Sequence, residues 1–311
     1  MDIAVTGATG LIGGALTTAL RADGHRVRVV TRGSGAATGP DTVRWDPAAG
    51  TIDADGLDGV DAVVHLAGAG IGDKRWNEAR KREILESRTQ GTELLARTLA
   101  GLDPRPSVLV SGSAVGIYGD RGDEELTEES PHGDDFLADL VEQWEAAAAP
   151  AAEAGIRVAW ARTGLVMARG GLLKPLLPLF KLCLGGRLGS GRQWMSWISI
   201  DDEVGAIRHL LDTPGLAGPY NLTAPHPVTN AEFTDTLGRV LGRPTVLPIP
   251  SLGPNLLFGK EMAALTAFVS QRVRSDKLAA SGYTFRHDDL EAALRAVLDR
   301  PATGPARGEA A

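Results

Sequence analysis

The feature that most constrains this chain is a glycine-rich turn between an apolar strand and a helix. Residues 1–5 form a short apolar run typical of a buried strand, and residues 11–20 carry apolar side chains at helical spacing. A second apolar strand over 26–31 completes a strand-helix-strand unit. In this context, glycines let the backbone turn sharply and approach a pyrophosphate closely. The turn therefore predicts dinucleotide binding by Gly7, Thr9, Gly10, Leu11, Ile12 and Gly13.

The end of the second strand indicates which dinucleotide is bound. An NAD site usually has a carboxylate here for the ribose 2′-hydroxyl, whereas an NADP site uses arginine against the 2′-phosphate. The chain reads Thr31, Arg32, Gly, Ser at this point, with no carboxylate between residues 24 and 40. The prediction is NADP(H), held by Thr31 and Arg32; a solvated loop arginine is the alternative. Asp46 is expected to hold the adenine amino group or, equally well, to form an Asp-Pro turn.

Strand and helix patterns alternate beyond this unit. Apolar runs over 60–67, 107–111 and 157–161 read as further buried strands, and helical patterns cover 77–99 and 134–149. This alternation predicts an α/β fold with a doubly wound parallel sheet of the Rossmann type and a smaller C-terminal substrate-binding cap. We expect an NADP-binding domain over 1–165 with 195–225 returning to it. The cap is expected over 166–194 and 226–298, with a disordered tail over 299–311.

Composition excludes several classes of protein. The net charge of −7 argues against non-specific nucleic-acid binding, which needs a basic surface. A single cysteine, Cys183, excludes an intramolecular disulfide. The longest apolar stretch, 172–184, is too short and too interrupted to span a bilayer. The histidines are scattered, so no metal site is expected. With a strand already at the N-terminus, the prediction is a cytoplasmic protein with a small-molecule partner and neither nucleic acid nor membrane.

Several motifs in order resemble those of the extended short-chain dehydrogenase/reductases. Within them the chain is similar to the nucleoside-diphosphate-sugar epimerase-like subgroup with a C-terminal domain of unknown function. Beyond the glycine turn, the motifs lie at 65–68, 75–76, 87–88, 113–119, 143–145, 189–194, 196–202 and 221–225. The resemblance implies a Rossmann fold and NADPH; a homodimer is suggested only by analogy of fold. We place Leu66, Ala67, Gly68, Arg88 and Arg162 at the cofactor pocket, although a solvated helix surface is the ordinary interpretation of Arg88.

The catalytic pair of the superfamily is missing. Its enzymes use a tyrosine whose phenolate is stabilised by a lysine four residues later. The tyrosines here are Tyr118, Tyr220 and Tyr283, and the residues four further on are glycine, alanine and histidine. On the helix where the pair is expected, residues 140–145 are largely apolar or bulky. The usual tyrosine mechanism cannot operate unchanged.

Three residues are candidates to replace the pair. Ser113 occupies the position of a serine that binds a substrate carbonyl or hydroxyl, with Ser111 as a competing assignment. Tyr118 is a candidate proton donor, and a packed aromatic is the alternative. Glu145 is a candidate acid of raised pKa if it is buried beside Trp144. Its alternative is capping or pairing on a helix face.

The cap supplies the candidate substrate residues. Residues 186–192 resemble a P-loop but lack its Lys-Ser/Thr ending, which excludes a nucleoside triphosphatase. An anionic substrate would suit Arg187, Arg192, Trp194 and Trp197, although structural packing explains the tryptophans equally well. The leading hypothesis is an NADP-dependent oxidoreductase or epimerase acting on a small polar substrate, with nucleotide sugars among the candidates. The alternative is a non-catalytic NADPH-binding sensor or scaffold, since some relatives carry a cell-division association.

Overall fold

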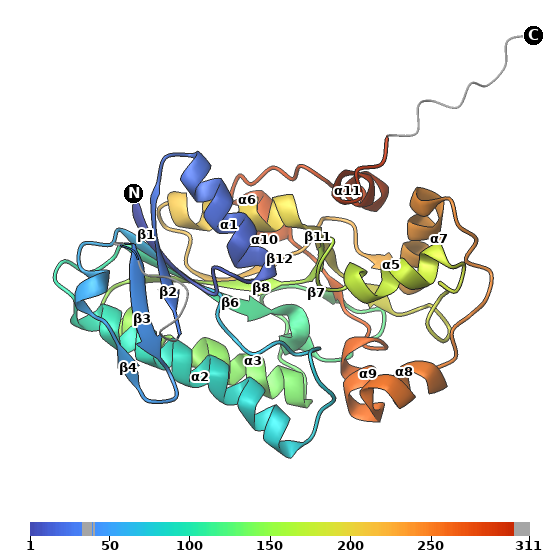
Figure 1. Cartoon of the computed structure of the whole chain (residues 1–311), viewed down its shortest axis with the longest axis horizontal. Coiled ribbons are helices and arrows are strands. Elements are labelled where there is room, and N and C mark those ends of the chain that lie inside the picture. The colour runs from blue at the N-terminus through green and yellow to red at the C-terminus, as the bar shows by residue number, and fades with distance from the viewer. Residues whose placement is uncertain (33–38, 40, 302–311) are drawn as a thin grey trace, which may run out of the picture.

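The computed structural model describes residues 1–32, 39 and 41–301, and its centre is an eight-stranded sheet (Figure 1). The strand order is β12-β8-β6-β5-β1-β2-β3-β4. All neighbours pair in parallel except β3 and β4, which are antiparallel. The strands are β1 Asp2–Thr6, β2 Arg26–Thr31, β3 Thr42–Asp46, β4 Thr51–Ile52, β5 Ala62–His65, β6 Val108–Ala114, β8 Arg157–Thr163 and β12 Gly218–Leu222. The predicted doubly wound α/β fold is confirmed.

Helices cover both faces of the sheet, which is why its central strands are continuously apolar. One face carries α1 (Leu11–Ala22), α6 (Ile200–Asp212) and α10 (Asp276–Ala280). The other carries α2 (Glu78–Gly101), α3 (Phe136–Ala146) and α4 (Ala149–Glu153). All four residues of β5 are buried between these layers. Single-turn 3-10 helices are η1 (Asp55–Leu57) and η2 (Val115–Tyr118).

Residues after β8 build most of the cap at one end of the molecule (Figure 1). Its helices are α5 Leu173–Lys181, α7 Asn230–Leu241, α8 Leu252–Phe258, α9 Lys260–Thr266 and α11 Leu290–Val297. Short strand pairs join it to the sheet region: β9 Leu165–Met167 with β11 Trp197–Ser199, β10 Trp194–Met195 with β13 Val228–Thr229, and β7 Glu125–Leu126 with β14 Arg272–Val273. A core of its own contains Leu173, Phe180, Phe233 and Leu237. Because the cap has a core of its own, we propose the same division into an NADP-binding domain and a cap that the sequence predicts.

Several element boundaries differ from the sequence prediction, and three of the differences have a structural reason or bear on the site. The strand expected over 107–111 continues to Ala114, so Ser113 lies in β6 and not in a loop. The helix expected over 134–149 is two helices, because Pro150 has no N–H to continue the α3 ladder. The helix expected from residue 77 begins one residue later, with the Asn77 side chain accepting a hydrogen bond from Arg80 N at 2.8 Å. The part of the predicted tail from residue 302 lies outside the described residues.

Candidate functional site

The glycine turn after β1 has the geometry that a nucleotide phosphate needs. Gly7 has φ +67°, and a Cβ built on it would stand 2.7 Å from the carbonyl of Leu66. A Cβ on Gly13 would clash with the carbonyl oxygen of Gly7. Neither position therefore has room for a side chain, and the cradle depends on both glycines.

Helix α1 presents a bare N-terminus to this cradle. Its N-cap, Gly10, makes no side-chain capping bond, and the first turn contains no acidic residue. Unpaired amides and the positive end of the helix dipole favour an anion at this point. The chain near Gly170 covers the start of the helix, since a Cβ on Gly170 would stand 2.9 Å from Leu11. These features fit a dinucleotide pyrophosphate.

The ends of β2 and β3 carry the residues predicted for the adenosine half. Thr31 is half-buried and Arg32 is exposed. The two residues after Arg32, which contributed to the predicted motif, lie outside the described residues. Asp46 Oδ1 accepts hydrogen bonds from Ala48 N at 3.1 Å and Ala49 N at 3.2 Å, which favours the turn-forming alternative for this residue.

The loop after β5 is fixed by a buried Thr6–His65 pair. Thr6 Oγ1 accepts hydrogen bonds from Leu66 N at 3.0 Å and Ala67 N at 3.1 Å. Its hydroxyl is left to donate to His65 Nδ1, 2.8 Å away. Burial, followed by the charge of Arg88, lowers the pKa of His65 to about 4, so the ring is neutral near pH 7. This pair is a structural element that the sequence prediction did not include in the site.

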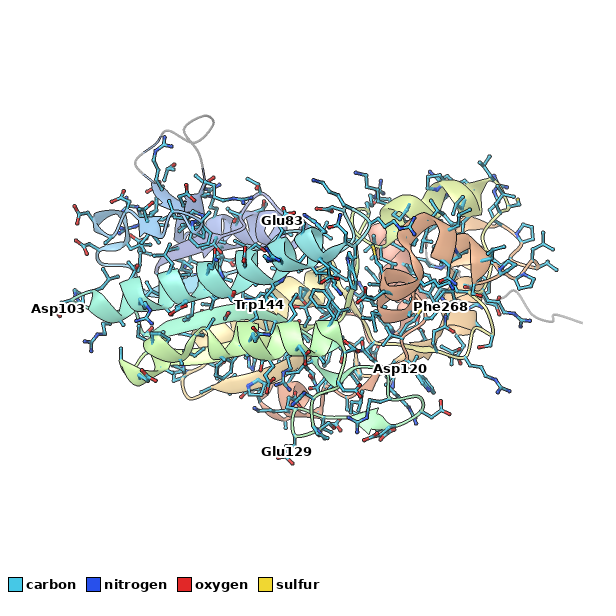
Figure 2. All side chains as sticks on the ribbon, turned by 90° about the horizontal axis from the view of Figure 1, so that it is seen from below. Glu83, Asp103, Asp120, Glu129, Trp144 and Phe268 are labelled. Atoms are coloured by element: carbon cyan, nitrogen blue, oxygen red, sulfur yellow. The ribbon has the colours of Figure 1, made fainter. Side chains whose placement is uncertain are left out.

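Arg88 lies under the same loop and is buried, so the interpretation as a solvated helix surface is wrong. Its Nη1 donates to Ala69 O at 2.9 Å and Ile84 O at 3.1 Å. The guanidinium stands 5.0 Å from the ring of Trp144, and Figure 2 shows Trp144 where α3 runs beside α2. Burial, and then the charge of Arg80, lower the pKa of Arg88 to about 10. Its Nε has no hydrogen-bond partner among the described residues.

The three predicted catalytic residues meet in one hydrogen-bonded network centred on Arg162. Ser113 Oγ donates to Glu145 Oε1 at 2.5 Å. Arg162 donates to both oxygens of Glu145, at 2.8 and 2.9 Å, and to the Tyr118 hydroxyl at 3.0 Å. Tyr118 in turn donates to Asn221 Oδ1 at 2.6 Å. Burial opposes the charge of Arg162, yet its bonds to Glu145 and Tyr118 leave its pKa raised.

This network bears on the alternatives for each residue. Tyr118 is fully buried with its hydroxyl bonded on both sides, and burial raises its pKa, which together favour the packed aromatic. Glu145 pairs with Arg162 on β8, so its partner comes from the sheet and not from its own helix face. Ser111 is fully buried and donates to the neighbouring Gly112 O, whereas Ser113 joins the network. Asn221 was not among the predicted site residues.

Another buried carboxyl, in the first turn of α6, lies beside the end of β8. Glu203 is fully buried, and its Oε1 accepts a hydrogen bond from Thr163 Oγ1 at 2.7 Å. Its Oε2 has no partner among the described residues. Burial raises the pKa of Glu203 to about 8, so this carboxyl keeps its proton near neutral pH. Its sequence signal was weak, because Glu203 follows two other acidic residues in the first turn of α6.

The predicted substrate residues differ in exposure. Arg187 and Arg192 are exposed. Trp194 is half-buried; its Nε1 donates to Asp123 Oδ1 at 2.8 Å, and Arg272 stands 4.6 Å from its ring. Trp197 is fully buried in the cap core and donates to His226 O, which favours structural packing. A substrate role stays a prediction for all four.

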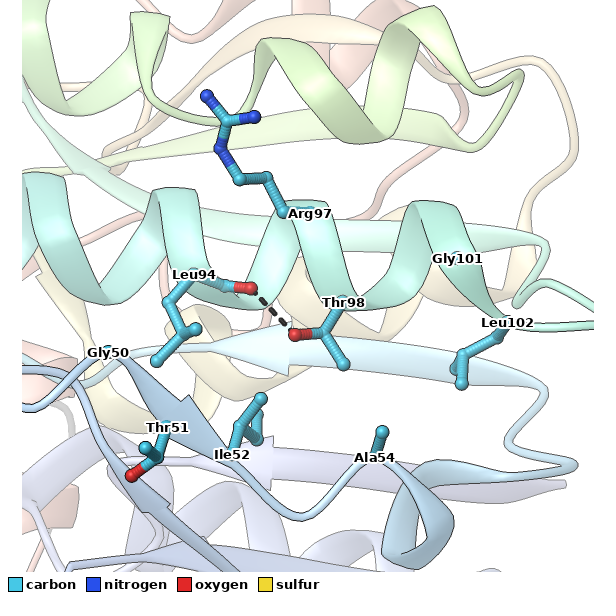
Figure 3. Close-up of a pocket in the computed structure, with 9 residues that line it drawn as sticks. All are labelled: Gly50, Thr51, Ile52, Ala54, Leu94, Arg97, Thr98, Gly101 and Leu102. Carbon is cyan, nitrogen blue, oxygen red and sulfur yellow. Dashed lines mark hydrogen bonds between the residues drawn. The ribbon is translucent and has the colours of Figure 1, made fainter.

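A surface pocket lies away from these groups, beside β4 and the second half of α2 (Figure 3). Its lining is Gly50, Thr51, Ile52, Ala54, Leu94, Arg97, Thr98, Gly101 and Leu102. None of these residues belongs to the predicted site. Among the described residues, no group of three or more metal-ligating side chains comes together, and no helix is long and apolar enough to cross a membrane.

The parallel sheet, the glycine cradle and the bare start of α1 define a dinucleotide-binding protein of the Rossmann type. The chain belongs to the NAD dependent epimerase/dehydratase family, whose model matches residues 3–222. Residues 249–297 match a domain of unknown function, DUF1731. Both matches confirm the resemblance predicted from the motifs.

Relatives from distant organisms match almost the whole chain. Epimerase family protein Mb2239 of Mycobacterium bovis is 44% identical over 301 residues, covering 96% of this chain and 98% of the relative. Epimerase family protein SDR39U1 of Homo sapiens is 40% identical over 305 residues, covering 96% of this chain and 100% of the relative. The crystal structure of human SDR39U1 isoform 2 with NADPH superposes with a TM-score of 0.87 at 37% identity, covering 96% of this chain and 99% of the other.

Proposed function

We propose that this protein binds NADP(H) and uses it for oxidoreductase or epimerase chemistry on a small polar substrate. The observation that carries the proposal is the cradle in which Gly7 and Gly13 leave no room for a Cβ. Arg32 at the end of β2, with no acidic residue beside it in sequence, favours a 2′-phosphate. A human relative has been solved with NADPH, which supports the same choice.

The chain offers separate groups for the two halves of the cofactor. The turn at Gly7 to Gly13 would hold the pyrophosphate with backbone amides, and Arg32 would bind the 2′-phosphate. The loop at 66–68, fixed by Thr6, would border the nicotinamide half together with Arg88. Bound NADP(H) supplies hydride transfer to or from a carbon of the substrate.

A proton must accompany that hydride, and Ser113 is our candidate to move it. Its hydroxyl donates to Glu145, so its oxygen lone pairs remain to accept a proton from a substrate hydroxyl. Oxidation of an alcohol would then send one proton through Ser113 to Glu145, while Arg162 holds the carboxylate in place. Reduction of a carbonyl would run the same route in reverse. We assign Tyr118 to positioning Arg162, because its own proton points at Asn221.

A non-catalytic NADPH sensor or scaffold is the second candidate. The observation that favours it is that Ser113, Glu145, Arg162 and Tyr118 satisfy one another's hydrogen bonds within the protein. Net consumption of NADPH with a carbonyl substrate would identify a reductase. Inversion of a sugar centre without net consumption would identify an epimerase. Tight NADPH binding with neither activity would favour the sensor.

The first test is thermal unfolding with NADPH, NADP⁺, NADH and NAD⁺. A ligand at 100 times its dissociation constant stabilises the folded state by about 2.7 kcal/mol. We expect a shift with NADPH and NADP⁺ that Arg32→Ala reduces. The control is Arg97→Ala, which removes a guanidinium that is 68% exposed from the second half of α2 and should leave the shift unchanged. No shift with any of the four nucleotides would overturn the proposal.

A further inference from the structure

Large apolar side chains stand in solvent on one part of the cap. Among the described residues, six are at least 69% exposed: Leu182, Val246, Leu247, Leu252, Leu256 and Leu257. We call this group the apolar face. Contiguous exposed apolar surface of this kind is uncommon on a monomeric protein and marks an interaction site.

Two segments far apart in sequence bring these residues together. Residues 186–189 run beside 247–249: Ile249 N donates to Arg187 O at 2.8 Å, and Gly189 N donates to Ile249 O at 3.0 Å. Gly186 lies so close that a Cβ there would clash with Leu247 O. Leu182 precedes the first segment, and α8 follows the second. These contacts place Leu247 beside the segment that follows Leu182, so the exposed apolar residues of both segments lie in the same part of the cap.

Helix α8 is oriented with its leucines outward. Leu252 and Leu256 are four residues apart on one side of the helix, and each is 76% exposed. Pro254, between them in sequence, is the buried residue of α8. A helix of a soluble protein normally turns its apolar stripe toward the core. The opposite orientation here is explained if the apolar stripe meets something outside the chain.

The charge around the apolar face is predominantly positive in sequence. Residues 166–200 contain five lysines and arginines and no acidic residue. Residues 235–261 contain three against two carboxylates, Asp235 and Glu261, which accept hydrogen bonds from Thr245 and Lys81. Lys181, Arg187 and Lys260 are exposed next to the apolar residues. The chain as a whole carries −7, so this positive segment stands out. An anionic partner would complement it, whereas a two-fold interface with a second copy would bring like charges together.

We propose that the apolar face docks this protein peripherally on an anionic lipid bilayer. The leucines would enter the boundary between headgroups and acyl chains, and Lys181, Arg187 and Lys260 would meet the lipid phosphates. A bilayer needs no groove, and the pocket described above lies beside β4 and the second half of α2 and not on this face. The proposal departs from the sequence prediction of no membrane partner. The sequence argument behind that prediction tested only whether a segment could span a bilayer. The stretch 172–184, too short and too interrupted for that, includes Leu182 of the apolar face.

The test is co-sedimentation of the full chain with vesicles of phosphatidylcholine alone or mixed with phosphatidylserine. We expect binding to the mixed vesicles that weakens as salt rises. The double variant L256Q/L257Q and the charge variant K181Q/R187Q should each lower the bound fraction at least fivefold. R97Q is the matched control, and it should bind like the parent chain. Circular dichroism and the thermal unfolding midpoint, both measured without nucleotide, check that each variant is folded.

Three results would overturn the proposal. The first is equal sedimentation with and without phosphatidylserine. The second is a parent chain that dimerises in solution while L256Q/L257Q is monomeric, which would make the apolar face an interface between copies. The third is binding to an acidic polypeptide such as polyglutamate but not to vesicles, which would indicate a protein partner. None of these results depends on NADPH binding, so the proposed function stands or falls separately.

Discussion

Ser113 Oγ donates a 2.5 Å hydrogen bond to Glu145 Oε1, linking the end of β6 to α3. The bond directs the hydroxyl proton toward the carboxylate, so the lone pairs of Ser113 Oγ remain free to accept a hydrogen bond from a substrate hydroxyl. It is the contact on which the proposed proton route depends. The carboxylate itself is held by two bonds from Arg162.

Removing the Ser113 hydroxyl should therefore stop turnover without affecting the cofactor. Loss of a positioned proton-transfer group typically costs about 10²–10⁴-fold in rate. We expect Ser113→Ala to lower the rate of substrate-dependent NADPH oxidation by that factor, with the NADPH dissociation constant unchanged. Ser111→Ala is the matched control two residues earlier on the same strand. A larger loss in Ser111→Ala than in Ser113→Ala would reverse the assignment.

Tyr118→Phe distinguishes positioning from proton donation. The change removes one bond to Arg162 and one to Asn221, and a buried hydrogen bond contributes about 0.5–1.5 kcal/mol. We expect a fall of roughly 1–3 kcal/mol in the free energy of unfolding, measured in urea, with turnover within a few-fold of the parent. Turnover that is abolished while NADPH still binds would restore Tyr118 as the proton donor.

Local patterns in the sequence account for the cradle and the sheet. The turn at Gly7 to Gly13 and the strands beside it are formed by residues that are close in sequence, so the spacing of these residues is enough to predict their geometry. The Tyr118–Asn221 bond joins residues 103 positions apart, and no local pattern could indicate it. The fold brings them together because β12 adds to the sheet beside β8.

The burial of Arg88 was missed for a different reason. Arg80, Ile84 and Arg88 follow one another at four-residue intervals on the buried side of α2. In a sequence, a charged residue within an apolar stripe suggests that the position is exposed to solvent. The aliphatic part of an arginine side chain can nevertheless pack in the core while its guanidinium is hydrogen-bonded. Here carbonyl oxygens of the 69–70 loop and of Ile84 accept from the two guanidiniums. The side chains of Arg80 and Arg88 therefore hold the loop after β5 in place through these hydrogen bonds.

Arg88→Met tests whether that braced loop serves the cofactor. Methionine keeps an apolar stem against Trp144 but removes the charge and the bond to Ala69 O. We expect NADPH to bind about tenfold more weakly, which is about 1.4 kcal/mol, as measured by calorimetry. Arg97→Met, an exposed change on the same helix, should not alter the affinity. An unchanged dissociation constant in Arg88→Met would limit Arg88 to a role in packing.

The buried carboxyl of Glu203 should make the stability of the protein depend on pH. Its pKa rises from 4.5 when unfolded to about 8 in the folded chain, because burial disfavours the carboxylate. Between these values the folded state keeps a proton that the unfolded state has released, so the contribution of Glu203 to stability falls as pH increases, with a slope of at most ~1.4 kcal/mol per pH unit. Below about pH 4.5 both states are protonated, and the effect vanishes.

Glu203→Gln should remove this dependence, because the amide is neutral at every pH and can still accept from Thr163. We expect its unfolding free energy, measured in urea, to gain on that of the parent chain as pH rises from 5 to 8. Asp201→Asn changes a half-exposed carboxylate in the same helical turn, and its difference from the parent should stay nearly constant. If the difference between Glu203→Gln and the parent instead stays constant from pH 5 to 8, Glu203 is ionised in the folded protein as it is in the unfolded one. The carboxyl at the end of β8 would then be a charge that needs a partner, and not a proton held in the core.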